Sequence, residues 1–291
     1  MKIFVTGASG FIGSAVTAEL IHAGHEVIGL ARSDKSAAAI AKAGAIPLYG
    51  SLEDLDSLKQ GASASDGVIN LGFNHDFSQF GASVQVEAQA IEVMGEVLKG
   101  TGHPLIIASG GPTLSEKFGE SVSINPREAI ARKVLEFAQQ NVRSAVVRLP
   151  PTVHDETKFG FVSTLIDLAR RTGISGYIED GSNRWCSVHR LDAAHLFCLA
   201  LEKAPAGSVL QGVGDEGIPL KEIAAKIGAR LNLPVRSIAN EDAEKHFGFV
   251  GRIARIDIPA SSAMTQKLLG WQPTHPGLLE DLEHSNIFNN P

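Results

Sequence analysis

The stretch that decides the fold is Met1-Lys-Ile-Phe-Val-Thr-Gly-Ala-Ser-Gly-Phe-Ile-Gly-Ser14. Residues 2–6 are strand formers, glycines then recur every third residue at Gly7, Gly10 and Gly13, and a helical pattern follows. Gly7 would allow a sharp turn, Gly10 a close approach to a pyrophosphate, and Gly13 close packing of the helix on the sheet. The free N–H groups at the start of that helix would face the phosphates. The stretch therefore predicts a dinucleotide-binding strand, turn and helix, against the alternative of an ordinary glycine turn.

Strands and helices alternate over the first 150 residues. The predicted strands are 2–6, 26–31, 45–49, 66–73, 104–108 and 144–149, and helical stretches lie between them at 35–43, 53–59, 83–99 and 126–140. This pattern predicts an α/β fold with a Rossmann-type, doubly wound parallel sheet. Beyond Pro150 the alternation breaks, and a strand at 208–213 is expected to return to the sheet. We therefore predict a cofactor domain of residues 1–150 plus about 189–214, and a smaller C-terminal substrate lobe of about 151–188 plus 215–291.

Composition limits the class of partner. The chain has 291 residues, of which 44% are hydrophobic and 20% charged, with a net charge of −6. That charge disfavours nucleic acid as a partner. The only cysteines, Cys186 and Cys198, form neither a disulfide framework nor a CxxC motif, and no clear histidine and acid cluster has metal spacing. We expect a cytoplasmic monomer or homodimer that binds a small-molecule substrate, neither nucleic acid nor membrane, and no metal.

The end of the predicted strand 26–31 bears on the choice of nucleotide. An acidic residue there holds the ribose hydroxyls of NAD, whereas an arginine accommodates the extra phosphate of NADP. This chain has Ala31 where the acid would stand, and Arg32 next to it. The pattern favours NADP(H); the alternative is that Arg32 is a solvated loop cation paired with Asp34.

Four segments together resemble the extended short-chain dehydrogenase/reductase superfamily, in its atypical, epimerase-like members. They are Thr6–Gly13, Arg148–Val153, Val188–Ala194 and Gly270–Pro273. The resemblance implies a Rossmann domain, bound NAD(P) and a C-terminal lobe that contacts substrate. The cofactor-binding residues that follow are Gly7, Ser9, Gly10, Phe11, Ile12, Gly13, Arg32, Ser33, Ser51, Leu52, Leu71, Gly72, Phe73, Arg127, Pro150 and Val153. Ser51 departs from the aspartate that commonly contacts adenine in the family, although the backbone of Leu52 could substitute.

The family's Tyr-x-x-x-Lys pair is missing. Its lysine lowers the pKa of the tyrosine from about 10, so that the phenol can exchange a proton with a carbonyl oxygen. Here Tyr49 is followed four residues later by Glu53, and Tyr177 by Gly181. One register of the expected helix puts Ser123 and Arg127 at the two places, and the other puts Ala129 and Lys133 there. We prefer the first, in which Arg127 would hold the ribose.

Another acid must therefore supply the proton if hydride transfer occurs. His75, beside Asp76, follows the fourth predicted strand; His154 follows the sixth; and Tyr177 lies in the substrate lobe. We rank them in that order. Ser109 is a candidate hydrogen-bonding group for substrate, although strict counting puts Gly110 at the family's hydroxyl position.

Three functions are compatible with this pattern. The leading hypothesis is an NADP(H)-dependent oxidoreductase that acts on a small carbonyl or alcohol with an atypical proton donor. The first alternative is a non-catalytic NADP(H)-binding sensor or interaction protein. The second is a sugar-nucleotide-type epimerase or dehydratase.

Overall fold

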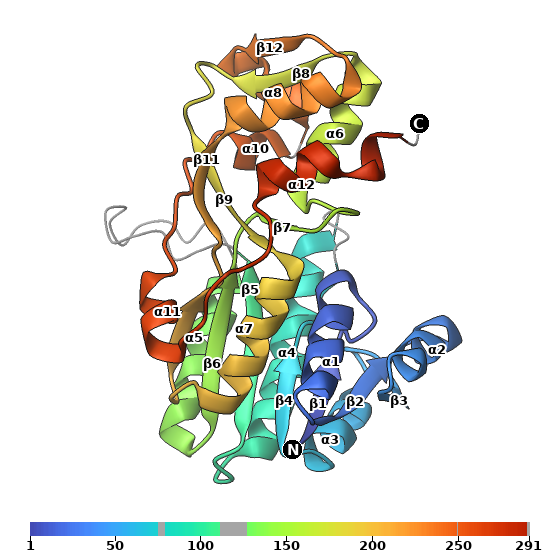
Figure 1. Ribbon diagram of the computed structural model, residues 1–291. Coiled ribbons are helices and arrows are strands. Elements are labelled where there is room, and N and C mark those ends of the chain that lie inside the picture. Colours follow the sequence, from blue (N-terminus) through green and yellow to red (C-terminus); the bar gives the residue numbers. More distant parts are fainter. Residues whose placement is uncertain (75–78, 111–126, 249, 290–291) are drawn as a thin grey trace.

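A computed structural model describes residues 1–74, 79–110, 127–248 and 250–289 of the chain. A seven-stranded sheet, parallel throughout, forms its lower half in Figure 1, with strand order β10-β6-β5-β4-β1-β2-β3. The strands are β1 (Lys2–Thr6), β2 (Glu26–Ala31), β3 (Ile46–Tyr49), β4 (Gly67–Asn70), β5 (Pro104–Gly110), β6 (Arg143–Leu149) and β10 (Ser208–Gln211). The expected return of a strand near residue 208 to the main sheet is confirmed.

Helices cover both faces of this sheet. One face carries α1 (Phe11–His22), α2 (Asp34–Lys42) and α7 (Arg190–Lys203), and the other carries α3 (Leu55–Ser63), α4 (Phe80–Leu98) and α5 (Arg127–Glu136). Side chains alternate along each strand, so that Ile3 and Val5 pack in one core cluster and Phe4 in the other. The predicted doubly wound Rossmann-type sheet is therefore present.

The C-terminal half adds two small sheets above the carboxyl ends of the main strands (Figure 1). The first contains β7 (Thr152–His154), β9 (Arg184–His189) and β11 (Asp215–Pro219), and the second pairs β8 (Ser175–Ile178) with β12 (Val235–Ile238). The further helices are α6 (Phe161–Thr172), α8 (Leu220–Leu231), α9 (Ala243–Phe247), α10 (Val250–Ala254), α11 (Ala263–Leu269) and α12 (Leu278–His284). Short 3₁₀ segments lie at Phe137–Gln140, just before β6, and at Asn240–Asp242 and Asn286–Asn289. Within the described ranges, no helix is long and apolar enough to cross a membrane.

The start of α7 is set by His189. The helix begins at Arg190, and His189 is its N-cap, accepting the N–H of Leu191 at 3.2 Å. The carboxylate of Asp192, in the first turn, has another role. It accepts the N–H groups of Thr274 and His275, at 3.0 and 3.1 Å, and so ties the C-terminal segment to α7.

Candidate cofactor and active site

The glycine turn has the geometry that the sequence predicts for a dinucleotide site. Gly7 has a φ of 68°, and a Cβ there would lie 2.8 Å from the nitrogen of Gly72. A Cβ on Gly13 would lie 1.9 Å from the carbonyl oxygen of Gly7, so α1 packs directly against the turn. Gly10 is the N-cap of α1, which has neither a side-chain cap nor an acidic residue in its first turn. The start of α1 therefore fits a pyrophosphate.

A buried hydroxyl fixes the neighbouring strand ends. Thr6 Oγ1 donates to Asn70 Oδ1 at 2.6 Å and accepts the N–H of Gly72 at 3.0 Å. A Cβ on Gly72 would lie 3.1 Å from a methyl group of Leu52. These contacts bring Gly7, Leu52 and Gly72 together, as expected for residues that share one cofactor site.

The end of β2 leaves one cation exposed. Ala31 is fully buried, and the exposed Arg32 makes no ion pair within the part of the chain that the structure describes. Asp34, its alternative partner, instead accepts a hydrogen bond from the Tyr49 hydroxyl at 3.0 Å, which raises the pKa of that phenol. The hydroxyl of Ser33 caps α2. The alternative interpretation, an Arg32–Asp34 pair, is therefore not formed among the described residues.

The Ser51 hydroxyl is held by its own turn. It accepts the N–H groups of Glu53 and Asp54, at 3.2 and 3.3 Å. Ser51 stands where the resemblance implies an aspartate, and here its hydroxyl caps the turn that follows it. The neighbouring Leu52 lies beside Gly72.

Two cations beside the start of α1 were not anticipated. Arg190 lies with its Cζ 4.9 Å from the Phe11 ring centre and donates to Ser14 Oγ at 3.4 Å, while Lys158 Nζ lies 5.4 Å from the same ring. Arg190 also donates to Asp155 Oδ2 at 2.7 Å. Arg190 belongs to the 188–194 motif, but nothing in that motif indicates a contact with Ser14 in the first turn of α1, 176 residues earlier.

A buried ion pair occupies the end of β5. Arg127 donates from Nε to Glu87 Oε2 at 2.7 Å and from a terminal nitrogen to the Ala108 carbonyl at 2.9 Å, and its guanidinium lies 4.4 Å from the Phe73 ring centre. Glu87 is 1% exposed, and burial raises its pKa although Arg127 opposes the shift. Arg127 thus lies beside the end of β5, with much of its hydrogen-bonding capacity used by Glu87 and Ala108.

A second pair holds Ser109. Arg148 donates to both carboxylate oxygens of Glu128, at 2.6 and 2.8 Å, and to Ser109 Oγ at 3.3 Å. The hydrogen bonds from Arg148 lower the pKa of Glu128 against the effect of its partial burial. Ser109 is 2% exposed, so its hydroxyl is shielded from solvent and in contact with Arg148.

The two helix registers considered for the family's catalytic positions place their residues differently. Lys133 points to the surface and donates to Glu92 Oε1 at 2.6 Å, with about half of each side chain exposed. Arg127 contacts the carbonyl of Ala108 at the end of β5. This placement favours the register of Ser123 and Arg127, although Ser123 lies outside the described residues.

The three candidate proton donors fall in different places. His75, with Asp76, lies outside the described residues. His154 is completely buried on β7, with Nδ1 2.7 Å from Asp281 Oδ2 and its ring packed edge-on against His189. Tyr177 belongs to β8, in the two-stranded sheet at the far end of the C-terminal half (Figure 1). The structure does not bring His154 and Tyr177 together with Ser109.

The His154 cluster continues to the C-terminal segment. The rings of His189 and His275 are stacked with centres 4.7 Å apart, and His275 Nδ1 lies 2.8 Å from Asp192 Oδ1. Burial lowers the pKa of His189; Asp281 opposes that shift, while His154 and His275 add to it. Pro150 and Val153, two predicted cofactor residues that precede His154, are also buried. The cluster therefore connects β7 and the start of α7 with the C-terminal segment.

The comparisons with known proteins agree with this geometry. The model of the NAD-dependent epimerase/dehydratase family matches residues 3–103. An uncharacterised protein of Schizosaccharomyces pombe is 49% identical over 99% of this chain and all of its own length, and one of Saccharomyces cerevisiae is 47% identical over the same shares. The chain belongs to the NAD-dependent epimerase/dehydratase family.

A more distant family relative has a stated activity. It is the 4-hydroxy-2-methyl-3-oxo-4-farnesyl-3,4-dihydroquinoline-1-oxide ketoreductase of Stigmatella aurantiaca, 25% identical over 72% of this chain and 67% of that protein. Among solved structures, the UDP-glucose 4-epimerase of Thermus thermophilus in complex with NAD has a TM-score of 0.73, 16% identity and 99% coverage of both chains. The epimerase of Thermotoga maritima with UDP-glucose has the same TM-score and coverage at 18% identity. These structures share the fold of this chain.

Proposed function

We propose that this family member is an NADP(H)-dependent oxidoreductase that interconverts a small carbonyl compound and its alcohol. The observation that carries the proposal is the exposed Arg32 at the end of β2, beside the buried Ala31 and without an ion pair among the described residues. An arginine in this place can bind the ribose phosphate that distinguishes NADP from NAD. The nicotinamide, when bound, supplies the hydride. The ketoreductase relative supports this class of reaction.

The chain's own residues would bind and orient the cofactor. The free N–H groups at the start of α1 would hold the pyrophosphate, and Arg190 and Lys158 add positive charge beside the same turn. Phe73 and Phe80, edge-on with centres 5.8 Å apart, provide an apolar contact near the end of β4. The proton would come from a group other than the family's tyrosine, with His75 first, His154 second and Tyr177 third, and Ser109 as a hydrogen-bonding group.

Replacing Arg32 tests the choice of nucleotide. Arg32→Ala should weaken NADPH by about 10- to 150-fold and leave NADH unchanged, because a charge-assisted hydrogen bond contributes about 1.5–3 kcal/mol. Titration calorimetry with each nucleotide measures both dissociation constants. Lys42→Ala, which removes an exposed cation from the other end of α2, is the matched control. Equal weakening of NADPH and NADH would contradict the assignment of Arg32.

The alternative of a non-catalytic NADP(H) sensor also has a specific observation behind it. Arg127, which replaces the family's lysine in the favoured register, is engaged by Glu87, and a guanidinium does not release its proton. A protein whose affinity for a partner differs between NADPH and NADP+, with no substrate turned over, would favour this alternative. Protein purified with tightly bound nucleotide would instead favour an epimerase or dehydratase, as in the structural neighbours.

A further inference from the structure

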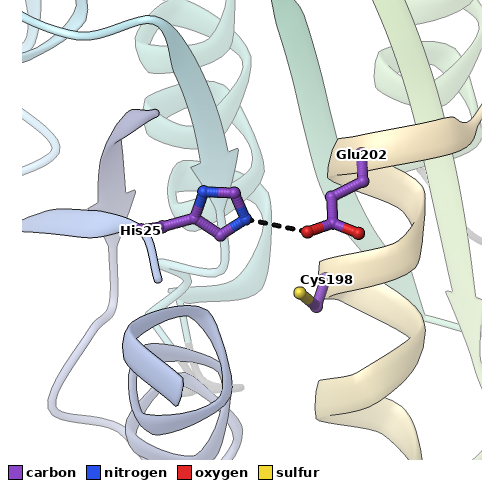
Figure 2. A group of neighbouring side chains, drawn as sticks. All are labelled: His25, Cys198 and Glu202. Atoms are coloured by element: carbon purple, nitrogen blue, oxygen red, sulfur yellow. Dashed lines mark hydrogen bonds and ion pairs between the residues drawn. The ribbon is translucent and has the colours of Figure 1, made fainter. Parts of the chain in front are cut away.

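Three side chains with metal-binding atoms meet at the amino end of the main sheet, away from the glycine turn. His25 precedes β2, and Cys198 and Glu202 lie one turn apart on α7. Figure 2 shows the imidazole, thiol and carboxylate directed toward one another. His25 Nε2 lies 3.0 Å from Glu202 Oε1, and the three ligand atoms all lie within 4.8 Å of one another.

We propose that His25, Cys198 and Glu202 bind a divalent cation of the zinc class. A thiolate, an imidazole and a carboxylate form the mixed donor set that suits Zn²⁺ better than Mg²⁺ or Ca²⁺. Water would complete the coordination. The metal would link the α1–β2 turn to α7 at the amino end of the main sheet, opposite the end that carries the glycine turn.

The local charge favours a cation at this position. α1 ends at His22 and α7 ends at Lys203, so the negative dipole ends of two helices lie next to the three side chains. Glu19 adds a second carboxylate near Cys198 and pairs with His195, and Lys203 is the opposing cation. These carboxylates and helix ends are offset in part by Lys203 and by the amino group of Met1, which lies 3.4 Å from His25 Nδ1.

The side chains have the freedom to close on a metal. Tetrahedral zinc with bonds of about 2.0–2.3 Å brings its ligand atoms to roughly 3.3–3.8 Å from one another. The ligand atoms lie within 4.8 Å of one another, so the separations need to shrink by at most about 1 Å. The side chain of Glu202 is 32% exposed and has room to move, whereas His25 is 8% exposed and Cys198 is buried.

Binding requires a proton to leave. Burial, with smaller contributions from Glu202 and Glu19, raises the pKa of the Cys198 thiol to about 12, and Lys203 opposes the shift. On binding, the S–H bond breaks, the proton passes to solvent and a sulfur–metal bond forms. Binding through Nε2 requires the imidazole proton on Nδ1, so the contact of 3.4 Å between Nδ1 and the amino group of Met1 must open when the metal binds.

Cobalt(II) is the probe for this site. Full-length protein without a histidine tag should bind about one Co²⁺ and develop a thiolate-to-cobalt charge-transfer band in the near ultraviolet. Cys198→Ser should abolish the band, and Cys186→Ser should keep it, because Cys186 is a buried free thiol on β9, in the three-stranded sheet and not in the proposed site. Absence of the band in the wild type, or its persistence in Cys198→Ser, would overturn the proposal.

A second variant guards against a failure of Cys198→Ser to fold. Glu202→Gln changes a partly exposed side chain and should weaken Co²⁺ binding at least tenfold while the metal-free protein keeps its circular dichroism spectrum. Unchanged Co²⁺ affinity in Glu202→Gln would remove the carboxylate from the site and overturn the proposed ligand set. NADPH binding, measured on the same samples, should not change, because the metal site lies at the amino end of the main sheet and the glycine turn lies at its carboxyl end.

Discussion

The hydroxyl of Thr6 hydrogen-bonds the end of β4 and the N–H of Gly72, and replacing it tests how much these two bonds stabilise the glycine turn. Thr6 is completely buried, and its Oγ1 satisfies both Asn70 Oδ1 and the N–H of Gly72. Thr6→Val keeps the shape but leaves two buried polar groups without this partner, each at a cost of about 1–3 kcal/mol. One added buried methyl group returns about 1 kcal/mol. We expect Thr6→Val to lower the free energy of unfolding by about 1–5 kcal/mol.

The measurement is urea denaturation of the nucleotide-free protein, followed by circular dichroism. Thr6→Ser keeps the hydroxyl and should cost about 1 kcal/mol, the value of one buried methyl group. Thr17→Val is the matched control, because Thr17 is equally buried but makes one long hydrogen bond, 3.5 Å to the Ala8 carbonyl. Its cost should stay below about 1 kcal/mol. If Thr6→Val were no more destabilising than Thr6→Ser or Thr17→Val, the reasoning about this hydroxyl would be refuted.

Two further variants test the glycine turn and the histidine cluster. Gly13→Ala should displace α1, because its Cβ would meet the Gly7 carbonyl oxygen, and it should lower both the melting temperature and the NADPH affinity. Gly81→Ala is the control: Gly81 has open space around it in α4, so this change should be neutral or stabilising. A Gly13→Ala protein with unchanged NADPH affinity would contradict the packing argument. His189 has a pKa below its ordinary 6.5 in the folded protein because it is buried, so its contribution to stability is complete above pH 6.5 and is lost as the pH falls through that lowered pKa. His189→Asn keeps a capping side chain and should flatten the fall in melting temperature below pH 6.5; an unchanged pH profile would show that another group titrates.

The main sheet could be predicted from the sequence because its signals are local. Each of the first six strands is a short apolar run next to a helical pattern, and Gly7, Gly10 and Gly13 specify the turn between β1 and α1. β9 was not predicted. Its residues, Arg184–His189, form a strand by pairing with β7 and β11, and no alternating pattern within the segment indicates those partners.

The chemistry of the site depended more on distant partners. The resemblance put Arg127 at the lysine position of the family's helix, but its ion pair with Glu87 joins residues 40 positions apart. His154 has the right position along the chain for a cleft residue, yet its partner Asp281 comes from the far C-terminus and holds it in the interior. The proposed metal ligands His25 and Cys198 are equally remote in sequence, which is why we expected no metal from the residue spacing.

The central claim, hydride transfer from NADPH, is tested most directly by isotope transfer. The protein is incubated with NADPH deuterated at the nicotinamide C4 position and with pooled small carbonyl compounds, and the products are analysed by mass spectrometry. NADPH binding is confirmed on the same sample by calorimetry. We predict a deuterated alcohol whose formation is reduced in Arg32→Ala. Tight NADPH binding without any labelled product would contradict the proposed carbonyl reductase activity and favour the sensor or the epimerase alternative.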